Sequence, residues 1–360
     1  MEWTTDQTRF VRRTLERLGN RVGPQHMSFL LKRHMNVSVT DAEVSELMRG
    51  LAEPAPQILA EPLKIPPKGR DLRGTCQDII NEIKAELGNN LHTCPVETTA
   101  EGLSALLVLS DLHIGEIIKV NGKTIFDLAI AEEKLADITT QFISAPELDG
   151  YEVEECIVLL AGDIIDGEMI YNGQSFDTNG HAFAQVKDAS ALIWETLCRL
   201  AAIFPVVKVY CVPGNHGRAS KLHHQMSNWD NVLYFGLQLM ADMAKINIEV
   251  HTPSQMWMDF KVRNYNVHTR HIGVVQASTS GPAKKIMTWM DGHDADLMFF
   301  GHFHSPELYS MGHRRIFKNG ALPPANDFAE MCGFQDGSGQ WMIGITDHNS
   351  VAFSKILIPG

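Results

Sequence analysis

Five short clusters of histidine, aspartate and asparagine lie far apart in the sequence, close to apolar stretches. They are Asp-Leu-His at 111–113, Gly-Asp at 162–163, Gly-Asn-His at 214–216, Val-His at 267–268 and Gly-His-Phe-His at 301–304. Imidazole and carboxylate groups are good ligands for Mn, Fe, Zn and Ni, and a carboxylate can bridge two ions as a neutral side chain cannot. The clusters therefore predict a site for two divalent metals, with Asp163 as the natural bridge.

The spacing inside two clusters suits shared coordination. Asp111 and His113 are two residues apart, so their side chains share a face of an extended segment. The same holds for His302 and His304, and Gly301 before them allows a tight turn from strand to loop.

Short apolar runs rich in β-branched residues alternate with helical stretches after residue 100, which predicts an α/β sheet core with a strand-rich C-terminal end. Strands are expected at 105–109, 156–161, 206–212, 272–276, 297–300, 341–346 and 351–358, and helices at 130–143, 183–202 and 228–244. The carboxyl ends of strands in such a sheet converge on one edge, where ligands normally bind. The clusters are therefore expected to share one site.

Residues 1–52 are predicted to form a small module of three helices. Its third helix opens with a capping box, in which the hydroxyl of Thr40 and the carboxylate of Glu43 each satisfy a backbone amide. Five prolines between residues 52 and 70 indicate a linker at 53–75, because proline removes amide donors and disfavours helix in the residue before it. The remainder, 76–360, is expected to be one large domain.

The composition bounds the class of protein. The chain has 360 residues, 44% of them apolar, and a formal net charge of -12, so a nucleic-acid substrate would have to be recognised at a local site. Its six cysteines are dispersed without a Cys-x-x-Cys pair, which indicates thiols in a reducing compartment. No apolar run approaches the ~20 residues of a membrane helix, and we expect a soluble cytoplasmic protein.

The five clusters, in this order, resemble the signature of the calcineurin-like metallophosphoesterases: D-x-H, G-D, G-N-H, a lone histidine and G-H-x-H. The resemblance covers about residues 100–330 and implies a β-sandwich flanked by helices (α/β/β/α) within 76–360. It implies two divalent metals as cofactors, with manganese expected first and iron, zinc or nickel also compatible.

The resemblance also implies the site residues. One metal would be held by Asp111, His113, Asp163 and His304, and the other by Asp163, Asn215, His268 and His302. His216 would not be a ligand but a catalytic residue that contacts the scissile phosphate and assists the leaving oxygen. Arg218, which follows the Gly-Asn-His cluster, is a candidate to bind a substrate phosphate, with an exposed arginine as the alternative.

The lone histidine has two candidates. His268 ends the apolar–polar alternation of 262–268, and we expect it to be the ligand. His271 is the alternative, because the family usually shows His-Gly here and this chain has Thr269 after His268. Asp166 is expected to orient neighbouring groups or to be solvated.

Two cations about 3.5 to 4 Å apart would activate a bridging water, align it opposite the leaving oxygen and neutralise charge on the phosphoryl oxygens. No protein nucleophile is required. The expected reaction is therefore direct attack of a metal-bridging hydroxide on a phosphoester, without a phospho-enzyme.

The motif flanks favour a phosphodiester in DNA as the substrate. Protein phosphatases of the superfamily typically carry Arg in G-D-x-x-D-R-G and Glu after G-N-H, whereas this chain has GDIIDGE and GNHGR. GNHGR, GHFHSPE and NGALPPANDFAE are more similar to phage and prophage phosphoesterases described as DNA-repair exonuclease-like, which implies a nuclease. The alternatives are a phosphatase or nucleotide phosphodiesterase, and a non-catalytic scaffold that retains the metal site.

The N-terminal module is a candidate surface for partners. Its first helix carries a basic patch, formed by Arg9, Arg12, Arg13, Arg17 and Arg21. Its third helix carries Asp41, Glu43 and Glu46, a poor charge set for a groove lined with phosphates. Delivery of DNA to the site, homodimerisation and docking of a partner protein all stay open.

Overall fold

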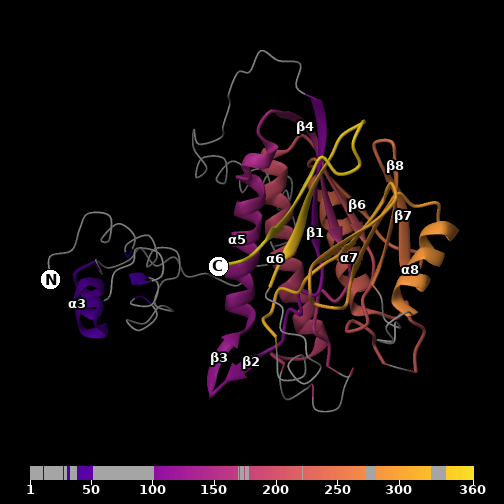
Figure 1. The fold of residues 1–360 in the computed structure, drawn as a ribbon. Helices are drawn as coiled ribbons and strands as arrows, with labels where there is room; N and C mark the ends of the chain where they lie inside the picture. Colours follow the sequence, from indigo (N-terminus) through magenta and orange to yellow (C-terminus); the bar gives the residue numbers. More distant parts are fainter. Residues whose placement is uncertain are drawn as a thin grey trace. The chain divides into compact units, whose positions relative to one another are not determined.

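The structure of the chain is a computed structural model (Figure 1). The residues that it describes are 11, 27, 31, 32, 39–51, 101–168, 170, 174, 178–220, 222–271, 281–325 and 338–360. The chain divides into two compact units, Met1–Arg70 and Asp71–Gly360, and each is described by itself. The linker expected at 53–75 lies outside the described residues, so the predicted domain boundaries stay a prediction.

In the N-terminal unit, helix α3 spans Asp41–Leu51 and opens with the predicted capping box. The amide of Glu43 donates to the hydroxyl of Thr40 (3.3 Å), and the amide of Thr40 donates to the carboxylate of Glu43 (2.9 Å). Val44 of this helix is buried in an apolar cluster with Val11, Met27 and Leu31. Most of the first two predicted helices lies outside the described residues.

The larger unit contains two sheets. The first has six strands: β1 (Glu101–Leu109), β4 (Tyr151–Leu160), β5 (Val207–Cys211), β6 (Ile248–His251), β12 (Gln340–Ile345) and β13 (Phe353–Leu357). Their spatial order is β13-β12-β1-β4-β5-β6. Strands β1, β4, β5 and β6 run parallel, and β12 pairs antiparallel with both of its neighbours, β1 and β13.

The second sheet has five strands: β7 (Trp257–Val262), β8 (Tyr265–His271), β9 (Leu297–Gly301), β10 (Glu307–Met311) and β11 (Arg314–Lys318). Their order is β10-β11-β9-β8-β7. Strands β8, β9 and β11 run parallel, and antiparallel strands close both edges. A short hairpin pairs β2 (Ile118–Val120) with β3 (Lys123–Phe126).

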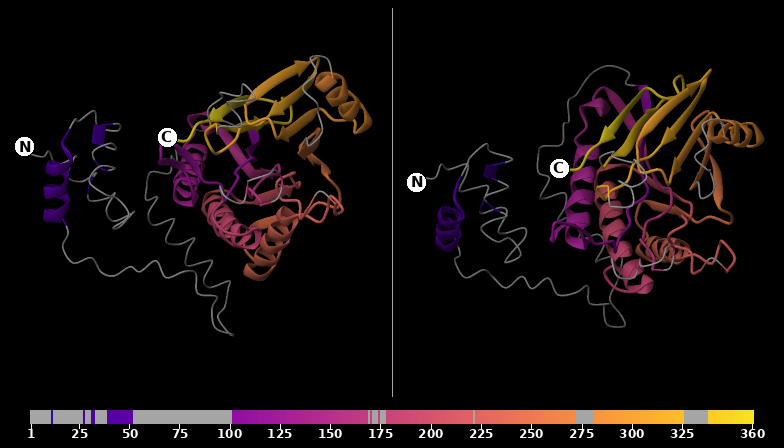
Figure 2. Two further views of the ribbon diagram at one scale, coloured as in Figure 1. Left: turned by 90° about the horizontal axis from the view of Figure 1, so that it is seen from below. Right: turned by 60° about the horizontal axis from the view of Figure 1, so that its bottom comes forward.

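Helices cover the outer faces of both sheets (Figures 1 and 2). Helices α5 (Leu128–Ile143), α6 (Ala182–Ile203) and α7 (Trp229–Ala244) pack on the first sheet, and α8 (Gly281–Gly292) packs on the second. A turn of 3-10 helix, η3 (Pro146–Leu148), follows α5. The expected α/β/β/α sandwich is therefore confirmed.

The second halves of the central strands, Ala105 to Leu109 of β1 and Cys156 to Leu160 of β4, are apolar without interruption because both of their faces are buried. Along β1, Leu106 and Val108 pack between the two sheets, whereas Leu107 and Leu109 pack under helices α5 to α7. Successive side chains of a strand point to opposite faces, so a strand covered on both sides becomes a continuous apolar run. This is the pattern from which the sequence predicted β1 and β4.

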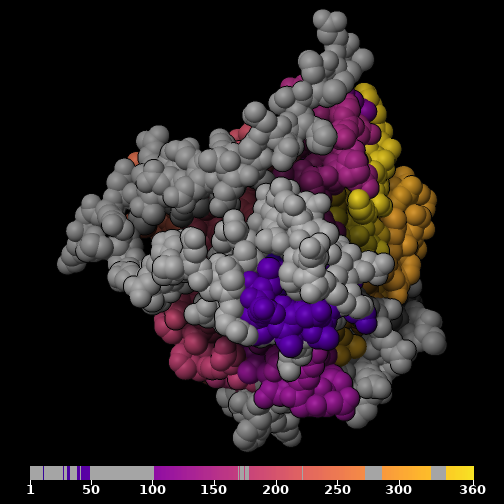
Figure 3. Space-filling view, turned by 90° about the vertical axis from the view of Figure 1, so that its left-hand side faces the viewer, coloured from indigo at the N-terminus to yellow at the C-terminus, as the bar shows by residue number. Residues whose placement is uncertain are grey.

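The C-terminal strand β13 closes one edge of the first sheet beside α5. Lys355 of β13 forms an ion pair with Glu147 (2.9 Å), and the side chain of Gln141 donates to the carbonyl of Ile358 (2.9 Å). In the space-filling view, yellow atoms of the C-terminal stretch lie against magenta atoms of this region (Figure 3). The predicted strand-rich C-terminal end is therefore present.

Two further predictions concern a strand after residue 271 and membrane-spanning helices. The strand expected at 272–276 lies outside the described residues, and the described strand in this part of the chain is β8, which ends at His271. No helix in the described part of the chain has the length and apolar content needed to cross a lipid bilayer.

Candidate metal centre

The carboxyl ends of β1, β4 and β5 lie at one edge of the sandwich, as do those of β8 and β9. Four of the five predicted clusters lie at or directly after these ends, and the fifth, at 267–268, lies within β8. Backbone hydrogen bonds join the loops to one another. The amide of Asp111 donates to the carbonyl of Gly162 (3.0 Å), and the amide of His113 donates to the carbonyl of Asp163 (3.1 Å). The first two clusters are therefore held side by side.

The backbone at the clusters is strained. Five predicted site residues have φ in the left-handed region, namely Asp111 (52°), His113 (45°), Asp163 (52°), His302 (90°) and His304 (58°). Such a conformation costs a non-glycine residue about 1–3 kcal/mol and persists only where the surroundings impose it, which happens most often at functional sites. The strain therefore supports a functional role for these loops.

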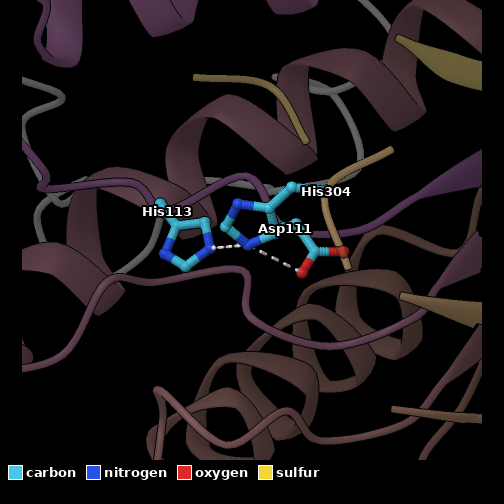
Figure 4. A group of neighbouring side chains, drawn as sticks. All are labelled: Asp111, His113 and His304. Atoms are coloured by element: carbon cyan, nitrogen blue, oxygen red, sulfur yellow. Dashed lines mark hydrogen bonds and ion pairs between the residues drawn. The ribbon is translucent and has the colours of Figure 1, made fainter. Parts of the chain in front are cut away.

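One group of ligand atoms joins Asp111, His113 and His304 (Figure 4). The Nε2 atoms of the two histidines are 3.2 Å apart, and Nε2 of His304 lies 3.4 Å from Oδ1 of Asp111. Asp111 and His113 are buried, whereas His304 is partly exposed. Two imidazole nitrogens and a carboxylate that converge in this way form a donor set suited to a divalent cation.

A second group joins Asp163, His271 and His302. Nε2 of His271 lies 2.9 Å from Oδ2 of Asp163, and its Nδ1 bonds to the carbonyl of Ala161 (2.9 Å). Nε2 of His271 is also 4.0 Å from Oδ1 of Asp111, so the two groups adjoin. The arrangement can hold a second cation next to the first.

The side-chain oxygen of Asn215 supports this assignment. Within the described part of the chain it is buried without a hydrogen-bond partner. Leaving a buried acceptor unsatisfied costs about 1–3 kcal/mol, so an oxygen of this kind calls for a ligand. Asn215 follows Gly214, where an added Cβ would overlap the carboxylate of Asp163, so the loop carrying Asn215 lies directly against the second group.

The prediction for the lone histidine requires a correction, because the structure brings His271 and not His268 to Asp163. His268 lies three residues earlier on β8, and an odd separation turns its side chain to the opposite face of the strand. Its Nδ1 is 2.6 Å from Oδ1 of Asp259, and its ring stacks on His293 with centroids 4.0 Å apart. We therefore replace His268 by His271 in the proposed ligand set.

The surroundings of His268 form a hydrogen-bonded group. Nε of Arg270 donates to Nε2 of His268 (3.0 Å), and a guanidinium cannot accept. Nε2 is therefore the acceptor, and Nδ1 carries the proton that is donated to Asp259. Burial, together with Arg270, lowers the pKa of His268 to about 4, which is consistent with this neutral tautomer.

Alanine at His271 and at His268 should separate the two assignments. We expect His271→Ala to lower the affinity for one of two bound Mn²⁺ ions by at least about 100-fold, the upper range for loss of even an indirect supporting group. His268→Ala should bind both ions as the wild type does. Equilibrium dialysis with elemental analysis measures the stoichiometry, and thermal melts show that both variants fold. Loss of an ion in His268→Ala alone would reverse the assignment.

Asp166 orients two of the predicted histidines. Its Oδ1 lies 3.1 Å from Nδ1 of His113 and 3.2 Å from Nδ1 of His216, and Nδ1 of His216 is also 2.8 Å from the carbonyl of Asp166. The side-chain amide of Gln174 donates to Oδ2 of the same carboxylate (3.1 Å). The expectation that Asp166 orients its neighbours fits this geometry better than the alternative of a solvated side chain, because Asp166 is buried.

Two histidines of the site have raised pKa values because carboxylates lie beside them. Burial alone would lower the pKa of His216, but the carboxylates of Asp163 and Asp166 outweigh it and raise that pKa to about 10. For His271, burial is likewise outweighed by Asp163 and Asp111, which raise its pKa to about 9. His271 would have to lose its proton to bind a cation at the second group, so metal affinity should increase with pH.

Asp230 holds the backbone of two loops at the proposed metal centre, and it was not predicted from the sequence. It is fully buried in the first turn of α7, and its carboxylate accepts from the amides of Gly214 (2.9 Å), Asp163 (3.2 Å) and Ile165 (3.4 Å). Burial and the neighbouring charge of Asp163 raise the pKa of Asp230 to about 6. Its only signal in the sequence is an acid in a first helical turn, which usually means interaction with the helix dipole.

A second buried network positions Asp111. The amide of His302 donates to its carboxylate (2.9 Å), and the hydroxyl of Ser110 donates to Oδ2. The side chain of Asn319 in turn donates to the Ser110 hydroxyl (2.9 Å). An added Cβ at Gly301 would overlap the carboxylate of Asp111, so glycine is needed here for close approach rather than for the turn that the sequence suggested.

A two-sheet sandwich with aspartate and histidine groups at its strand ends defines the class of metal-dependent phosphoester hydrolases. A family model described as calcineurin-like phosphoesterase matches residues 105–306, more than half of the 360 residues. The chain belongs to the calcineurin-like phosphoesterase family. Family membership and the Asp and His groups together support binding of two divalent metals.

The chain is also similar to several solved structures. A predicted phosphoesterase from Streptococcus pneumoniae is 12% identical, with a TM-score of 0.31, and the match covers 71% of this chain and 97% of that chain. An archaeal phosphodiesterase is 11% identical (TM-score 0.32; 70% and 99% covered). Wild-type Vps29 from Entamoeba histolytica, complexed with zinc, is 10% identical (0.33; 70% and 96%). No curated protein matches the sequence significantly.

Proposed function

We propose that the protein is a dinuclear metal-dependent phosphodiesterase that cleaves DNA. The observation that carries the proposal is that two ligand groups adjoin, one of Asp111, His113 and His304 and one of Asp163, His271 and His302. His271 links them, because its Nε2 lies 2.9 Å from Oδ2 of Asp163 and 4.0 Å from Oδ1 of Asp111. Asn215 completes the second group. Manganese is the first metal to test, because mixed imidazole and carboxylate ligands accept it.

When bound, two divalent cations would activate a water molecule and neutralise charge on the phosphoryl oxygens. The protein positions the catalytic and ligand side chains. The carboxylate of Asp163 accepts from the amide of His216 (2.7 Å) through Oδ1 and pairs with His271 through Oδ2, so it fixes the catalytic histidine relative to the metal ligands.

His216 is proposed to protonate the leaving oxygen. Its Nδ1 is engaged by Asp166, so proton transfer to a substrate is assigned to Nε2. The carboxylates around it favour the protonated imidazolium, which is the form that a general acid requires. Arg218, whose Nε donates to the carbonyl of Asn215 (3.1 Å), is proposed to bind a substrate phosphate beside it.

Two glycines support a substrate other than a phosphoprotein. Gly167 stands where protein phosphatases of the superfamily carry Arg, and an added Cβ there would overlap the carbonyl of His216. Gly217 stands in place of their Glu, and an added Cβ would overlap the side chain of Asn228. The loops are therefore packed in a way that excludes both phosphatase side chains, which supports the resemblance of the motif flanks to exonuclease-like phosphoesterases of phages.

The cellular setting is part of the proposal. Cys156 and Cys211 are buried free thiols, which suits a reducing compartment, and we propose a cytoplasmic location. The role of the N-terminal module in dimerisation, partner docking or DNA delivery stays a prediction.

Hydrolysis of model esters tests the proposal. We expect the Mn²⁺-loaded protein to hydrolyse bis-p-nitrophenyl phosphate faster than p-nitrophenyl phosphate, to cleave single- or double-stranded DNA, and to lose both activities with a chelator. Preference for the monoester over DNA would overturn the substrate class. No turnover of any ester by folded, metal-loaded protein would instead favour a non-catalytic scaffold.

A further inference from the structure

The loop that follows the catalytic histidine, residues 217–228, is described at every position except 221, and its two ends pair with each other where they join the metal centre. Arg218 and Asn228 form an antiparallel bridge, and the amide of Ala219 donates to the carbonyl of Ser227 (2.9 Å). The side chain of Asn228 donates to the carbonyl of Gly214 (2.7 Å), in the loop that carries the proposed ligand Asn215. Whatever binds the 217–228 loop is therefore bound next to the reacting phosphate.

The tip of the loop presents an apolar side chain to solvent. The Ser220 hydroxyl accepts from the amide of Leu222 (3.1 Å) and bonds Nδ1 of His223 (3.0 Å), and the amide of Met226 donates to Nδ1 of His224 (3.1 Å). These turns keep Leu222 pointing away from the body, where its side chain is 95% exposed. Leu222 is the most exposed of the large apolar residues in the described part of the chain.

The charge around this leucine is one-sided. From Gly217 to Trp229 the sequence contains the cations Arg218 and Lys221 and the hydrogen-bonding side chains of His223 and His224, but no aspartate or glutamate, in a chain whose net charge is -12. Cationic side chains attract a phosphate backbone, and an exposed leucine can insert between bases or pack on them. An apolar tip within a basic loop is therefore complementary to nucleic acid, whose surface combines phosphates with base faces.

We propose that the 217–228 loop binds the DNA strand beside the scissile phosphate, with Leu222 against the bases and the basic side chains on the flanking phosphates. This inference rests on the proposed nuclease function, and it adds the part of the protein that distinguishes a polymer from a small ester. A small ester would reach the metal centre and Arg218 without touching Leu222 at the tip of the loop, whereas DNA would contact the tip as well.

The test compares two substrates in Leu222→Ser. Because the side chain of Leu222 is almost fully exposed, replacing it removes little packing from the fold. The variant should therefore fold and hydrolyse bis-p-nitrophenyl phosphate as the wild type does. We expect its kcat/KM for DNA to fall about tenfold, the effect of removing one leucine-sized apolar contact. Ile358→Ser is the matched control, because Ile358 is also an exposed aliphatic residue (63%) but lies at the C-terminal end.

The outcomes separate the two proposals. If wild type cleaves DNA and Leu222→Ser cleaves it equally well, the loop inference is overturned and the nuclease function stands. If wild type hydrolyses the small diester but not DNA, the nuclease function fails and the loop has no DNA to bind. An equal loss in Ile358→Ser would show a general effect of surface apolarity and would also overturn the inference.

Discussion

Asp163→Asn should abolish metal binding at the proposed centre and lower kcat/KM for bis-p-nitrophenyl phosphate by at least about 1,000-fold, since each tenfold in rate corresponds to 1.4 kcal/mol and metal catalysis supplies several. Asparagine keeps the volume of the buried side chain but not its charge. The change removes the charged partner of His271 and the carboxylate that we propose to bridge both cations. Elemental analysis of the purified protein and initial rates measure the two effects.

The control for this prediction is Asp149→Asn, the same chemical change at an exposed position. It should leave metal content and activity unaltered. Burial tends to raise the pKa of Asp163, but His271 and His216 outweigh it and hold that pKa well below its usual value, so the carboxylate is charged at neutral pH. Two metals retained in Asp163→Asn would therefore contradict the assignment of Asp163 as the bridge.

The sequence was informative where one physical constraint acts on consecutive residues. Strands β1 and β4 are buried on both faces, so their apolar runs predicted them, and the capping box of Thr40 and Glu43 is contained within four residues. The proposed ligand clusters after β1, β4, β5 and β9 could also be predicted. Parallel strands bring their carboxyl ends to a common edge of the sheet, so polar residues that follow such strands are expected to meet there.

The lone histidine shows where this reasoning fails. The alternation of 262–268 suggested a strand that ends at His268, whereas β8 continues to His271, whose partner in the ladder is Gly301 of β9. Both histidines are buried, one on each face, so burial and residue type alone do not distinguish them. Only the position of the strand end relative to β9 identifies the residue that reaches Asp163.

The supporting residues could not be predicted because their partners are remote in sequence. Asp230 accepts from the amide of Asp163, 67 residues away, and the side chain of Gln340 accepts from the amide of Ser110, 230 residues away. Such contacts depend on tertiary packing, and neither residue has a local pattern of its own. The proposed metal ligands follow from strand topology, whereas the groups that orient them depend on the packed core.

His216→Ala is expected to retain both metals and to lower kcat for DNA cleavage by about 100- to 10,000-fold, the range for loss of a general acid. Its imidazole contacts Asp166 and lies edge-on to the ring of His113, and its backbone amide donates to the proposed ligand Asp163. The imidazole is not itself in the proposed ligand set, so removing the side chain removes no proposed ligand atom. Metal content by elemental analysis and single-turnover cleavage of DNA measure the two quantities.

The leaving group then tells a proton donor from a phosphate contact. p-Nitrophenolate leaves readily without protonation, whereas the alkoxide released from DNA does not. A general acid at position 216 therefore predicts that His216→Ala loses far more activity on DNA than on bis-p-nitrophenyl phosphate, and that Asp166→Asn, which keeps the imidazole but weakens its orientation, loses less on both. Equal losses on the two substrates would assign His216 to binding of the phosphoryl group instead, because that interaction is the same whichever oxygen departs.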